Sequence, residues 1–263
     1  MSVRVSLDTG PFAVRRIRDL GVFDVGDTSI VVACDSSGGI GPKDADTYHA
    51  PAAVVAHFAV RVAVLELLAA GAAPVLVVDA LSVEADPTGS DMIAAARALI
   101  AEIGLGPEAL IGSTEDNVRV RATGIGVTAV GVAHRDALRC GSSEAGDDVL
   151  CIGSPLSAPA DDVYPGHPHI VSLSELERVR SLADVHDILP VGSHGIGYEL
   201  RQLAATAGLA FDVAPGCSVD MECSGGPATS VLASCTTAAA EAVRSIRADL
   251  PIEVVATLRP QGV

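Results

Sequence analysis

The sequence contains no tryptophan, and aromatic residues make up only 3% of its 263 positions. Because hydrophobic residues still account for 49% of the chain, the core must be built mainly from alanine, valine, leucine and isoleucine. Small aliphatic side chains of this kind suit helices packed closely on a β-sheet. The composition therefore predicts a globular mixed α/β protein and excludes a largely disordered chain.

Positive charge is also scarce. Lysine and arginine number 17 against 33 aspartates and glutamates, which gives a formal net charge of −16 at pH 7. A surface this acidic repels the phosphates of nucleic acids and of anionic lipids. We therefore expect neither a nucleic acid nor a membrane as a partner. An anionic substrate remains compatible with this charge if a cation accompanies it.

Signals for membrane insertion, secretion and disulfides are missing. The longest apolar run, residues 50–74, is interrupted by His57, Arg61 and Glu66, so it is not expected to cross a membrane. The N-terminal segment 1–12 has no apolar signal core, which predicts a cytoplasmic protein. The six cysteines show no C-x-x-C spacing. Buried reduced thiols are therefore expected rather than a disulfide framework.

Hydrophobic patterns typical of strands and helices occur in both halves of the chain. Strands are expected over 29–34, 75–79, 149–152, 229–233 and 252–258, and helices over 51–71, 89–103, 173–183, 195–208 and 236–248. Residues 118–133 alternate and predict two strands or one long bent strand. A change of composition at 138–147 predicts a boundary between an N-terminal lobe, residues 1–140, and a C-terminal α/β lobe, residues 141–263.

An aspartate and a glycine-rich stretch follow the first predicted strand. Asp35 is expected to be held rigidly at the end of that strand, at the start of a turn over 35–43. Glycines in the turn would let backbone N–H groups approach an anion, and Lys43 could reach a phosphate. The pattern is not a Walker A loop, because GxxxxGK[ST] is absent. A tight turn with a solvated aspartate is the alternative interpretation.

Glu66 lies inside the predicted apolar helix 51–71. A carboxylate there costs on the order of several kcal/mol unless it is paired or bound to a metal. The sequence leaves open whether Glu66 pairs with Arg61 or another residue, or binds a cation.

Acidic residues also follow the next predicted strands. Asp79 ends a short strand, where it either faces a ligand or is simply solvated. The turn 111–117, with the sequence IGSTEDN, contains Glu115 and Asp116. Oxygen-rich turns suit hard cations such as Mg²⁺, although an exposed polar turn would look the same.

The second half carries a glycine-rich loop, GSHGIG, directly before a predicted helix. Ser193 and His194 lie in this loop, which could bind an anion at the helix N-terminus. Capping of the helix by Ser193 is the alternative. His167 and His169 could bind a metal, but no cysteine–histidine pattern of the zinc type surrounds them, so ligation there is not expected.

In this order the segments resemble the aminoimidazole ribonucleotide (AIR) synthase superfamily. That group includes thiamine-monophosphate kinase, selenophosphate synthetase and a hydrogenase maturation factor. The resemblance covers nearly the whole chain and rests on VVACDSSGGIGPK, LELLAAGAAPVLVVDA, GSTEDN, and ATGIGVTAVGVA followed by GDDVLCIGSP. It implies a two-lobed mixed α/β fold whose N-terminal sheet joins that of a second copy into a barrel. ATP would bind near this homodimer interface, and the C-terminal lobe would close the site.

Within the superfamily the segments PVGSHGIGYE, SGGPATSVLAS and GSTEDN resemble the α-ribazole kinase group. The implied activity is phosphoryl transfer from Mg–ATP to α-ribazole in cobalamin lower-ligand salvage. Three departures from the pattern are Ser113, where relatives commonly carry a carboxylate, Glu66, where aspartate is usual, and His194, where the thiamine-monophosphate kinase has an acidic residue. The alternatives are a thiamine-monophosphate-type kinase, another ATP-dependent enzyme of the superfamily, or an ATP-binding partner protein that has lost catalysis.

The resemblance also implies a role for each candidate residue. The predicted catalytic residues are Asp35 and Lys43, and the predicted Mg²⁺ ligands are Asp35, Glu66, Glu115 and Asp116. The predicted ATP-binding residues are Ser36, Ser37, Gly38, Gly39, Gly41, Asp79, Gly112 and Thr114. The predicted substrate-binding residues are Ser193, His194 and Gly195.

Overall fold

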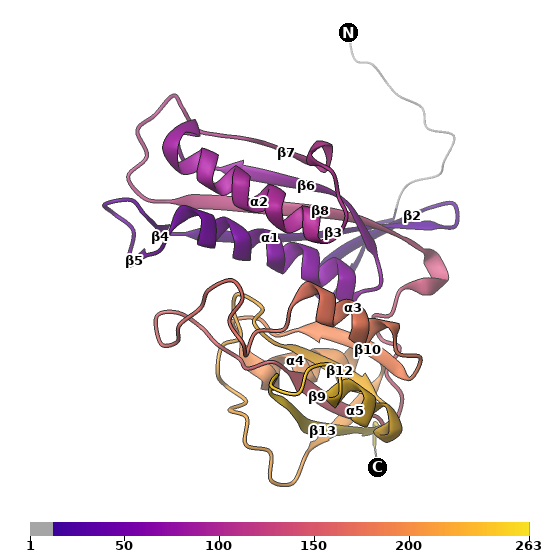
Figure 1. Cartoon of the computed structure of the whole chain (residues 1–263). Helices are drawn as coiled ribbons and strands as arrows, with labels where there is room; N and C mark the ends of the chain where they lie inside the picture. Colours follow the sequence, from indigo (N-terminus) through magenta and orange to yellow (C-terminus); the bar gives the residue numbers. More distant parts are fainter. Residues whose placement is uncertain (1–12, 263) are drawn as a thin grey trace.

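The computed structural model describes residues 13–262, so the segment 1–12, on which the predicted cytoplasmic location rests, lies outside the described residues. The chain forms two lobes, one above the other in Figure 1. The N-terminal lobe contains a six-stranded sheet, and the C-terminal lobe contains a five-stranded sheet. Helices pack on both sheets, which confirms the predicted two-lobed mixed α/β architecture.

The N-terminal sheet has the strand order β1-β2-β3-β8-β6-β7. Its strands are β1 (Arg15–Ile17), β2 (Leu20–Val25), β3 (Thr28–Gly38), β6 (Ala73–Leu81), β7 (Leu110–Ser113) and β8 (Gly124–His134). The helices of this lobe are α1 (Ala52–Ala69) and α2 (Ser90–Glu102), and two short strands, β4 (Ile40–Gly41) and β5 (Tyr48–His49), pair with each other. Neighbouring strands of the large sheet are antiparallel except β6 and β7, which are parallel.

Helix α1 occupies the centre of the molecule. Its length and hydropathy would allow it to cross a membrane, but most of it is buried inside the protein. It packs against the N-terminal sheet and α2, and also against elements of the C-terminal lobe. This explains why it is apolar on nearly every side, and it agrees with the prediction that residues 50–74 are not a membrane span.

Strand β3 is longer than the sequence predicts. Asp35 through Gly38 continue the antiparallel pairing with β8, opposite Val127 through Gly124. Asp35 therefore lies within a strand and not in a turn. The turn begins at Gly39, whose φ of +73° is a conformation that glycine adopts readily. Glycine and serine content suggested an earlier strand end, but pairing with β8 outweighs that local preference.

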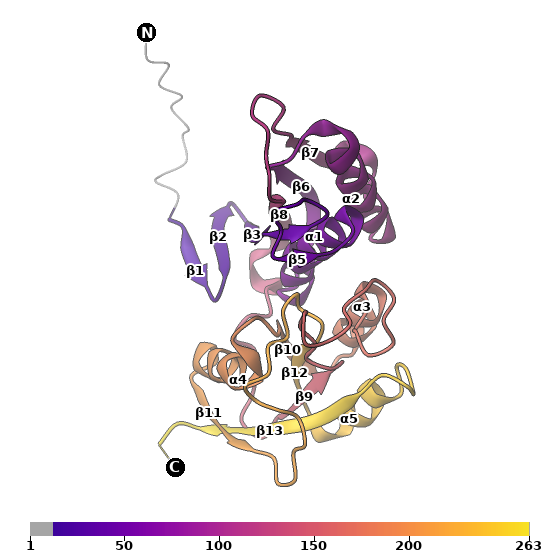
Figure 2. The same ribbon diagram turned by 90° about the vertical axis from the view of Figure 1, so that its left-hand side faces the viewer.

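The two faces of the N-terminal sheet differ in their covering. Figure 2 shows α1 and α2 on one side of it. On β3, Val31 and Ala33 are buried beneath the helices, and Asp35 lies on the same face. Val32 and Cys34 alternate to the other face and remain partly or fully exposed. No helix among residues 13–262 covers that face, and within one chain the sheet does not close into a barrel.

The exposure of Cys34 corrects one expectation. All six cysteines are free, as predicted, and Cys151 and Cys235 are buried. Cys34 is exposed because its side chain points to the uncovered face of the sheet.

The C-terminal sheet is antiparallel throughout, with the strand order β10-β12-β9-β13-β11. Its strands are β9 (Asp148–Ile152), β10 (Val185–Pro190), β11 (Leu209–Val213), β12 (Val231–Cys235) and β13 (Ile252–Pro260). Its helices are α3 (Leu173–Ser181), α4 (Gly195–Thr206) and α5 (Thr237–Arg244). The sequence missed β10 and β11, and it extended α4 and α5 past their ends at Thr206 and Arg244.

The lobes share a core. The segment 135–147 connects β8 to β9, and α1 packs against α3 and β10. One cluster of buried apolar residues continues from the N-terminal sheet through α1 to Leu176 of α3. A second cluster, around Leu200, lies between α4 and the C-terminal sheet. Because the lobes bury apolar surface against each other, their junction is a fixed part of the structure.

Candidate functional site

Asp35 and Glu66 lie on β3 and α1, two elements that pack together. Burial raises the pKa of Asp35 to about 6. Burial also raises the pKa of Glu66 to about 8, and the negative charges of Asp19, Glu199 and Asp35 add to this effect. We call Asp19, Asp35, Glu66 and Glu199 the junction carboxylates; the first three belong to the N-terminal lobe and Glu199 to the C-terminal lobe. Without a cation, Glu66 is mostly protonated at pH 7.

Two of the junction carboxylates were not predicted from the sequence. Asp19 lies in the turn between β1 and β2, a hairpin that was not predicted. Glu199 lies on α4 and is only 7% exposed, and burial raises its pKa to about 7. The sequence did contain an indication for Glu199, because this carboxylate lies next to Leu200 among the apolar residues of the predicted helix. A signal for Asp19 was the alternating stretch LGVFDV that follows it.

Arg18, the arginine whose charge acts on Glu66, is already paired. Arg18 donates from Nη1 and Nη2 to the two carboxylate oxygens of Asp187, at 3.0 and 2.5 Å. Both side chains are almost fully buried, with exposed fractions of 5% and 0%. Arg18 only partly offsets the repulsion at Glu66. Asp19 is exposed and lies 3.5 Å from Arg16, whereas Asp35, Glu66 and Glu199 make no ion pair among residues 13–262, so these three are short of positive charge.

This donor set fits Mg²⁺. Carboxylate oxygens are its preferred protein ligands, and Mg²⁺ is commonly held by one or two of them, with water and substrate phosphates completing the shell. Within residues 13–262, no three histidine, cysteine, aspartate or glutamate side chains stand close enough to hold an ion by themselves. A site that relies on Asp35, Glu66 and ligand oxygens is consistent with that arrangement.

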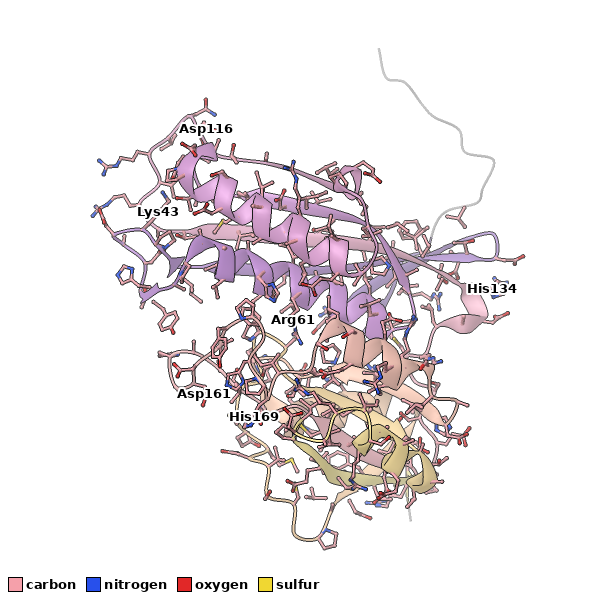
Figure 3. All side chains as sticks on the ribbon, viewed as in Figure 1. Lys43, Arg61, Asp116, His134, Asp161 and His169 are labelled. Carbon is pink, nitrogen blue, oxygen red and sulfur yellow. The ribbon has the colours of Figure 1, made fainter. Side chains whose placement is uncertain are left out.

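A large cavity, about 790 Å³ in volume, lies at one end of the N-terminal lobe and is called the Lys43 cavity below. Lys43, Glu115 and Asp116 all line it, and Figure 3 shows Lys43 and Asp116 at the same end of the lobe. Asp35 and Glu66 do not line it. The structure therefore divides the four predicted metal ligands between this cavity and the lobe junction.

Lys43 is held by a glutamate that the sequence analysis did not select. Its Nζ lies 2.5 Å from Oε2 of Glu84, and the hydroxyl of Thr88 donates to Oε1 of Glu84 at 2.5 Å. Burial opposes the charge on Glu84, but these hydrogen bonds lower its pKa to about 2. Because the ammonium group has three donors, a phosphate would either share Lys43 with Glu84 or displace Glu84. Arg119 and Arg121 also line the cavity and supply further positive charge.

The glycine-rich segment is tied down by Asp46. The Asp46 carboxylate accepts hydrogen bonds from the backbone N–H of Lys43 at 2.8 Å and from the backbone and hydroxyl of Thr123 at 2.6 and 2.7 Å. A Cβ at Gly41 would lie 2.2 Å from the Thr123 hydroxyl, so only glycine fits there. Gly39 donates to the Thr123 carbonyl. The loop that precedes Lys43 is therefore rigid.

The other predicted ATP-binding residues on β3 do not share one face. Ser36 lies on the uncovered face of the sheet with Gly38, and Ser37 lies on the helix-covered face with Asp35. One ligand therefore cannot contact the side chains of both serines without passing around the end of the strand.

Asp79 is buried and is not a solvated strand end. It is 3% exposed, and its Oδ2 has no hydrogen-bond partner. It pairs across the sheet with Gly112, where a Cβ would lie 1.6 Å from Asp79 Oδ1. Burial raises the pKa of Asp79. Gly112 is therefore required for packing around Asp79, and the predicted ATP contact of both residues stays a prediction.

Thr114 and Asp116 stabilise the loop after β7. The Thr114 hydroxyl donates to Asp116 at 2.7 Å, and the backbone N–H of Ala85 donates to the same carboxylate at 2.8 Å. Glu115 accepts from the backbone N–H of Asn117 at 2.8 Å. Both predicted metal ligands in this loop thus already accept hydrogen bonds from the protein.

The predicted substrate loop lies at the start of α4. Ser193 and His194 are exposed, and neither side chain caps the helix. Gly195 has a φ of +78°, and a Cβ there would lie 2.8 Å from the Met221 carbonyl. The backbone N–H of Gly225 donates to Gly192 at 3.0 Å, which joins this loop to the segment 221–226. Two loops of the C-terminal lobe therefore form one surface.

No protein-family model and no curated protein matches the sequence. Solved structures do match the fold. The chain resembles PurL from Thermotoga maritima, complexed with ATP, with a TM-score of 0.63 and 17% identity over 96% of this chain and 43% of that one. It resembles thiamine-monophosphate kinase from Stenotrophomonas maltophilia with a TM-score of 0.61 and 19% identity over 96% and 90% of the two chains.

The HypE–HypF complex gives a third match, with a TM-score of 0.63 and 15% identity over 91% of this chain and 87% of that one. The chain has the AIR synthase-like fold. This confirms the fold that the sequence motifs implied. The chain spans less than half of the PurL chain but nearly the whole length of the kinase.

Proposed function

We propose that the protein is a Mg–ATP-dependent phosphotransferase that acts on a small-molecule alcohol. The observation that carries this proposal is the lobe junction, where burial and neighbouring carboxylates raise the pKa of Glu66 to about 8 while Arg18 is committed to Asp187. A divalent cation would supply the missing positive charge. The shared fold with an ATP-complexed PurL and with a thiamine-monophosphate kinase supports the nucleotide.

In this proposal Asp35 and Glu66 hold Mg²⁺ at the junction. The ion would neutralise charge on the transferring phosphoryl group, so the nucleotide phosphates must extend from the Lys43 cavity to the junction. The Lys43 cavity accepts the nucleotide, with Lys43, Arg119 and Arg121 contacting phosphates. The rigid loop behind Lys43 fixes its position. Phosphoryl transfer depends mainly on positioning and charge, so these residues need not include a strong general base.

The proposed acceptor is α-ribazole, as a step in cobalamin lower-ligand salvage. Support comes from the resemblance of the loops at 190–199, 224–234 and 112–117 to those of α-ribazole kinase. The first two loops lie together, and Ser193 and His194 are exposed there. We propose that these two side chains and the Gly195 backbone contact the acceptor.

We also propose a cytoplasmic homodimer. A second copy would cover the exposed face of the N-terminal sheet, which carries half-buried aliphatic side chains such as Val32 and Val130. Covering this face removes apolar surface from water, and joining two such sheets would form the barrel that the resemblance implies.

A thiamine-monophosphate kinase activity and another ATP-dependent reaction of the same fold are alternative enzyme functions. A non-catalytic ATP-binding protein is a further candidate, favoured by the pairing of Lys43 with Glu84 and by Ser113, which offers no carboxylate. The acceptor that stimulates ADP release distinguishes the enzyme functions from one another, and no ADP release with any acceptor indicates a non-catalytic protein.

The test is ADP release from Mg–ATP with α-ribazole, thiamine monophosphate and simple nucleosides as acceptors. We expect α-ribazole-dependent ADP release, and its loss in Glu66→Gln. The matched control is Glu241→Gln, which changes an exposed glutamate of α5 that lies outside both cavities and is not a junction carboxylate. No ADP release with any acceptor, together with no thermal stabilisation by Mg–ATP, would contradict the proposed function.

A further inference from the structure

A second cavity, of about 250 Å³, lies where the lobes meet. Its walls come from α1 and α2 of the N-terminal lobe and from the segment 164–173 and Arg247 of the C-terminal lobe. None of its lining residues lines the Lys43 cavity. Figure 3 shows Arg61, one of its residues, at the boundary between the lobes.

The second cavity is also separate from the junction carboxylates. His57, Phe58 and Arg61 face it from one stripe of α1. Glu66 follows Arg61 by five residues, which places it about 140° further around the helix. Arg61 contacts the backbone of Val171 and Ala228, while Glu66 interacts with charges on other elements. The proposed Mg–ATP site therefore leaves this cavity unexplained.

The walls of the cavity are unusually rich in flat rings. The whole chain has only four phenylalanines, three tyrosines and no tryptophan. Phe58 and Tyr164 nevertheless both line this small cavity, together with His57 and His167. The His57 and Phe58 rings lie 5.1 Å apart, and the Tyr164 and His167 rings 5.0 Å apart. Flat walls contributed by both lobes favour a flat ligand.

His57 belongs to these walls as a neutral ring. Burial lowers its pKa to about 4, and the neighbouring Arg61 charge adds to this effect. At pH 7 the imidazole is therefore uncharged and offers a flat face together with one donor and one acceptor.

The polar groups of the cavity offer both a donor and an acceptor. Arg61 is 3% exposed and donates from Nη1 to the carbonyls of Ala228 and Pro227 and from Nη2 to that of Val171, and these hydrogen bonds do not use its Nε. It makes no ion pair with a carboxylate among residues 13–262. Glu102 lines the same cavity and supplies acceptor oxygens.

The remaining charges nearby offset one another. Arg247 pairs with Glu175 at 2.9 Å. Arg61 and Glu102 then contribute one charge of each sign. A ligand with a net charge would meet a repulsive charge as well as an attractive one and would also lose hydration, which disfavours it in a partly enclosed cavity.

We propose that this cavity is a second ligand site, which binds a neutral, planar nitrogen heterocycle between the two lobes. Its ring lies among His57, Phe58, Tyr164 and His167, while its ring nitrogens accept from Arg61 and donate to Glu102. The volume suits a fused bicyclic ring rather than a whole nucleotide. The site is independent of the proposed kinase reaction.

Benzimidazole is the probe that tests this site, with binding followed by calorimetry and by the melting temperature of the full chain. We expect saturable 1:1 binding and a rise in melting temperature, because a ligand held by both lobes stabilises the folded state. Benzoate, an anion of similar flatness, should bind at least about tenfold more weakly.

Two matched tyrosine variants locate the binding. Tyr164→Ser removes a ring of the cavity, and Tyr198→Ser removes one that lies 4.9 Å from His194 in the proposed acceptor loop. Tyr164 is 48% exposed and Tyr198 is 37% exposed, so both variants should fold. Tyr164→Ser should weaken benzimidazole binding by about tenfold, and Tyr198→Ser should leave it unchanged.

Three results would overturn the proposal. The first is no binding of benzimidazole to the wild type at millimolar concentration. The second is equal binding of benzoate. The third is loss of binding in Tyr198→Ser but not in Tyr164→Ser, which would assign the heterocycle to the acceptor loop and would support the kinase proposal instead.

Discussion

Arg18 and Asp187 form a two-pronged ion pair that joins the β1–β2 hairpin of the N-terminal lobe to β10 of the C-terminal lobe. The pair is almost completely buried, and Asp187 also accepts from the backbone N–H of Gly141 at 2.8 Å. It therefore fixes the hairpin, and with it Asp19, beside Glu66. Stability of the lobe junction and placement of the junction carboxylates depend on the same contact.

Removing one partner of this pair should destabilise the protein strongly. We expect Arg18→Met to lower the free energy of unfolding by about 3–5 kcal/mol, because Asp187 is left buried without a countercharge. The control is Arg15→Met, whose pair with Asp24 is far more exposed and should be worth about 0–1 kcal/mol. Urea unfolding measures both. Equal losses in the two variants would show that burial of the Arg18 pair does not matter.

Asp35→Asn should abolish phosphoryl transfer and leave the fold intact. The amide has nearly the same shape as the carboxylate, and β3 holds the residue by strand pairing and not by charge. Because burial raises the pKa of Asp35, removing the carboxylate should slightly raise the melting temperature without metal at pH 8. Asp27→Asn, at an exposed aspartate in the turn between β2 and β3, is the control. Wild-type turnover in Asp35→Asn would remove Asp35 from the mechanism.

The contact between Lys43 and Glu84 should compete with nucleotide binding. Lys43→Met should weaken Mg–ATP binding by about tenfold or more, and Glu84→Gln should strengthen it several-fold by releasing Lys43 for a phosphate. Calorimetric titration with Mg–ATP measures both effects. Weaker binding in Glu84→Gln would instead show that Glu84 shapes the cavity and does not compete for Lys43.

His57 should make the protein sensitive to mild acid. Its folded-state pKa is about 4, below the ordinary value of 6.5, so the unfolded chain takes up the proton first. Above pH 6.5 His57 is neutral in both states and costs no stability. As pH falls from 6.5 towards 4, the free energy of unfolding decreases by at most about 3 kcal/mol, because only the unfolded chain takes up the proton. The difference in unfolding free energy between wild type and His57→Gln should therefore shift against the wild type over this range. A difference that is independent of pH would contradict the neutral, buried imidazole.

A charge on the uncovered sheet face should separate the proposed dimer. Val32→Arg places a guanidinium on that face, where burial by a second copy would require it to lose its hydration. We expect light scattering to give the monomer mass for this variant and the dimer mass for the wild type. Val213→Arg, at a 51% exposed valine of β11, should remain dimeric. A monomeric wild type at micromolar concentration would exclude the dimer.

Local pattern was enough to predict much of this protein. The composition predicted the mixed α/β class, and the apolar length of 51–71 predicted a buried helix, because periodicity and burial are properties of a short stretch of chain. The motif order predicted the AIR synthase-like fold. Local pattern also selected Asp35, which follows an apolar strand, and Glu66, which lies inside an apolar helix; their roles as metal ligands stay predictions.

Tertiary structure alone decided how the site is assembled. Pairing with β8 kept Asp35 inside a strand, and the path of the chain after β7 placed Glu115 and Asp116 with Lys43 and away from Glu66. Glu199 joined Glu66 because the lobes pack together, and the hairpin that carries Asp19 is held by the pair of Arg18 and Asp187, which are 169 residues apart in sequence. Contacts between segments so far apart have no local signature. They are determined by strand pairing and by the burial of apolar surface between the lobes.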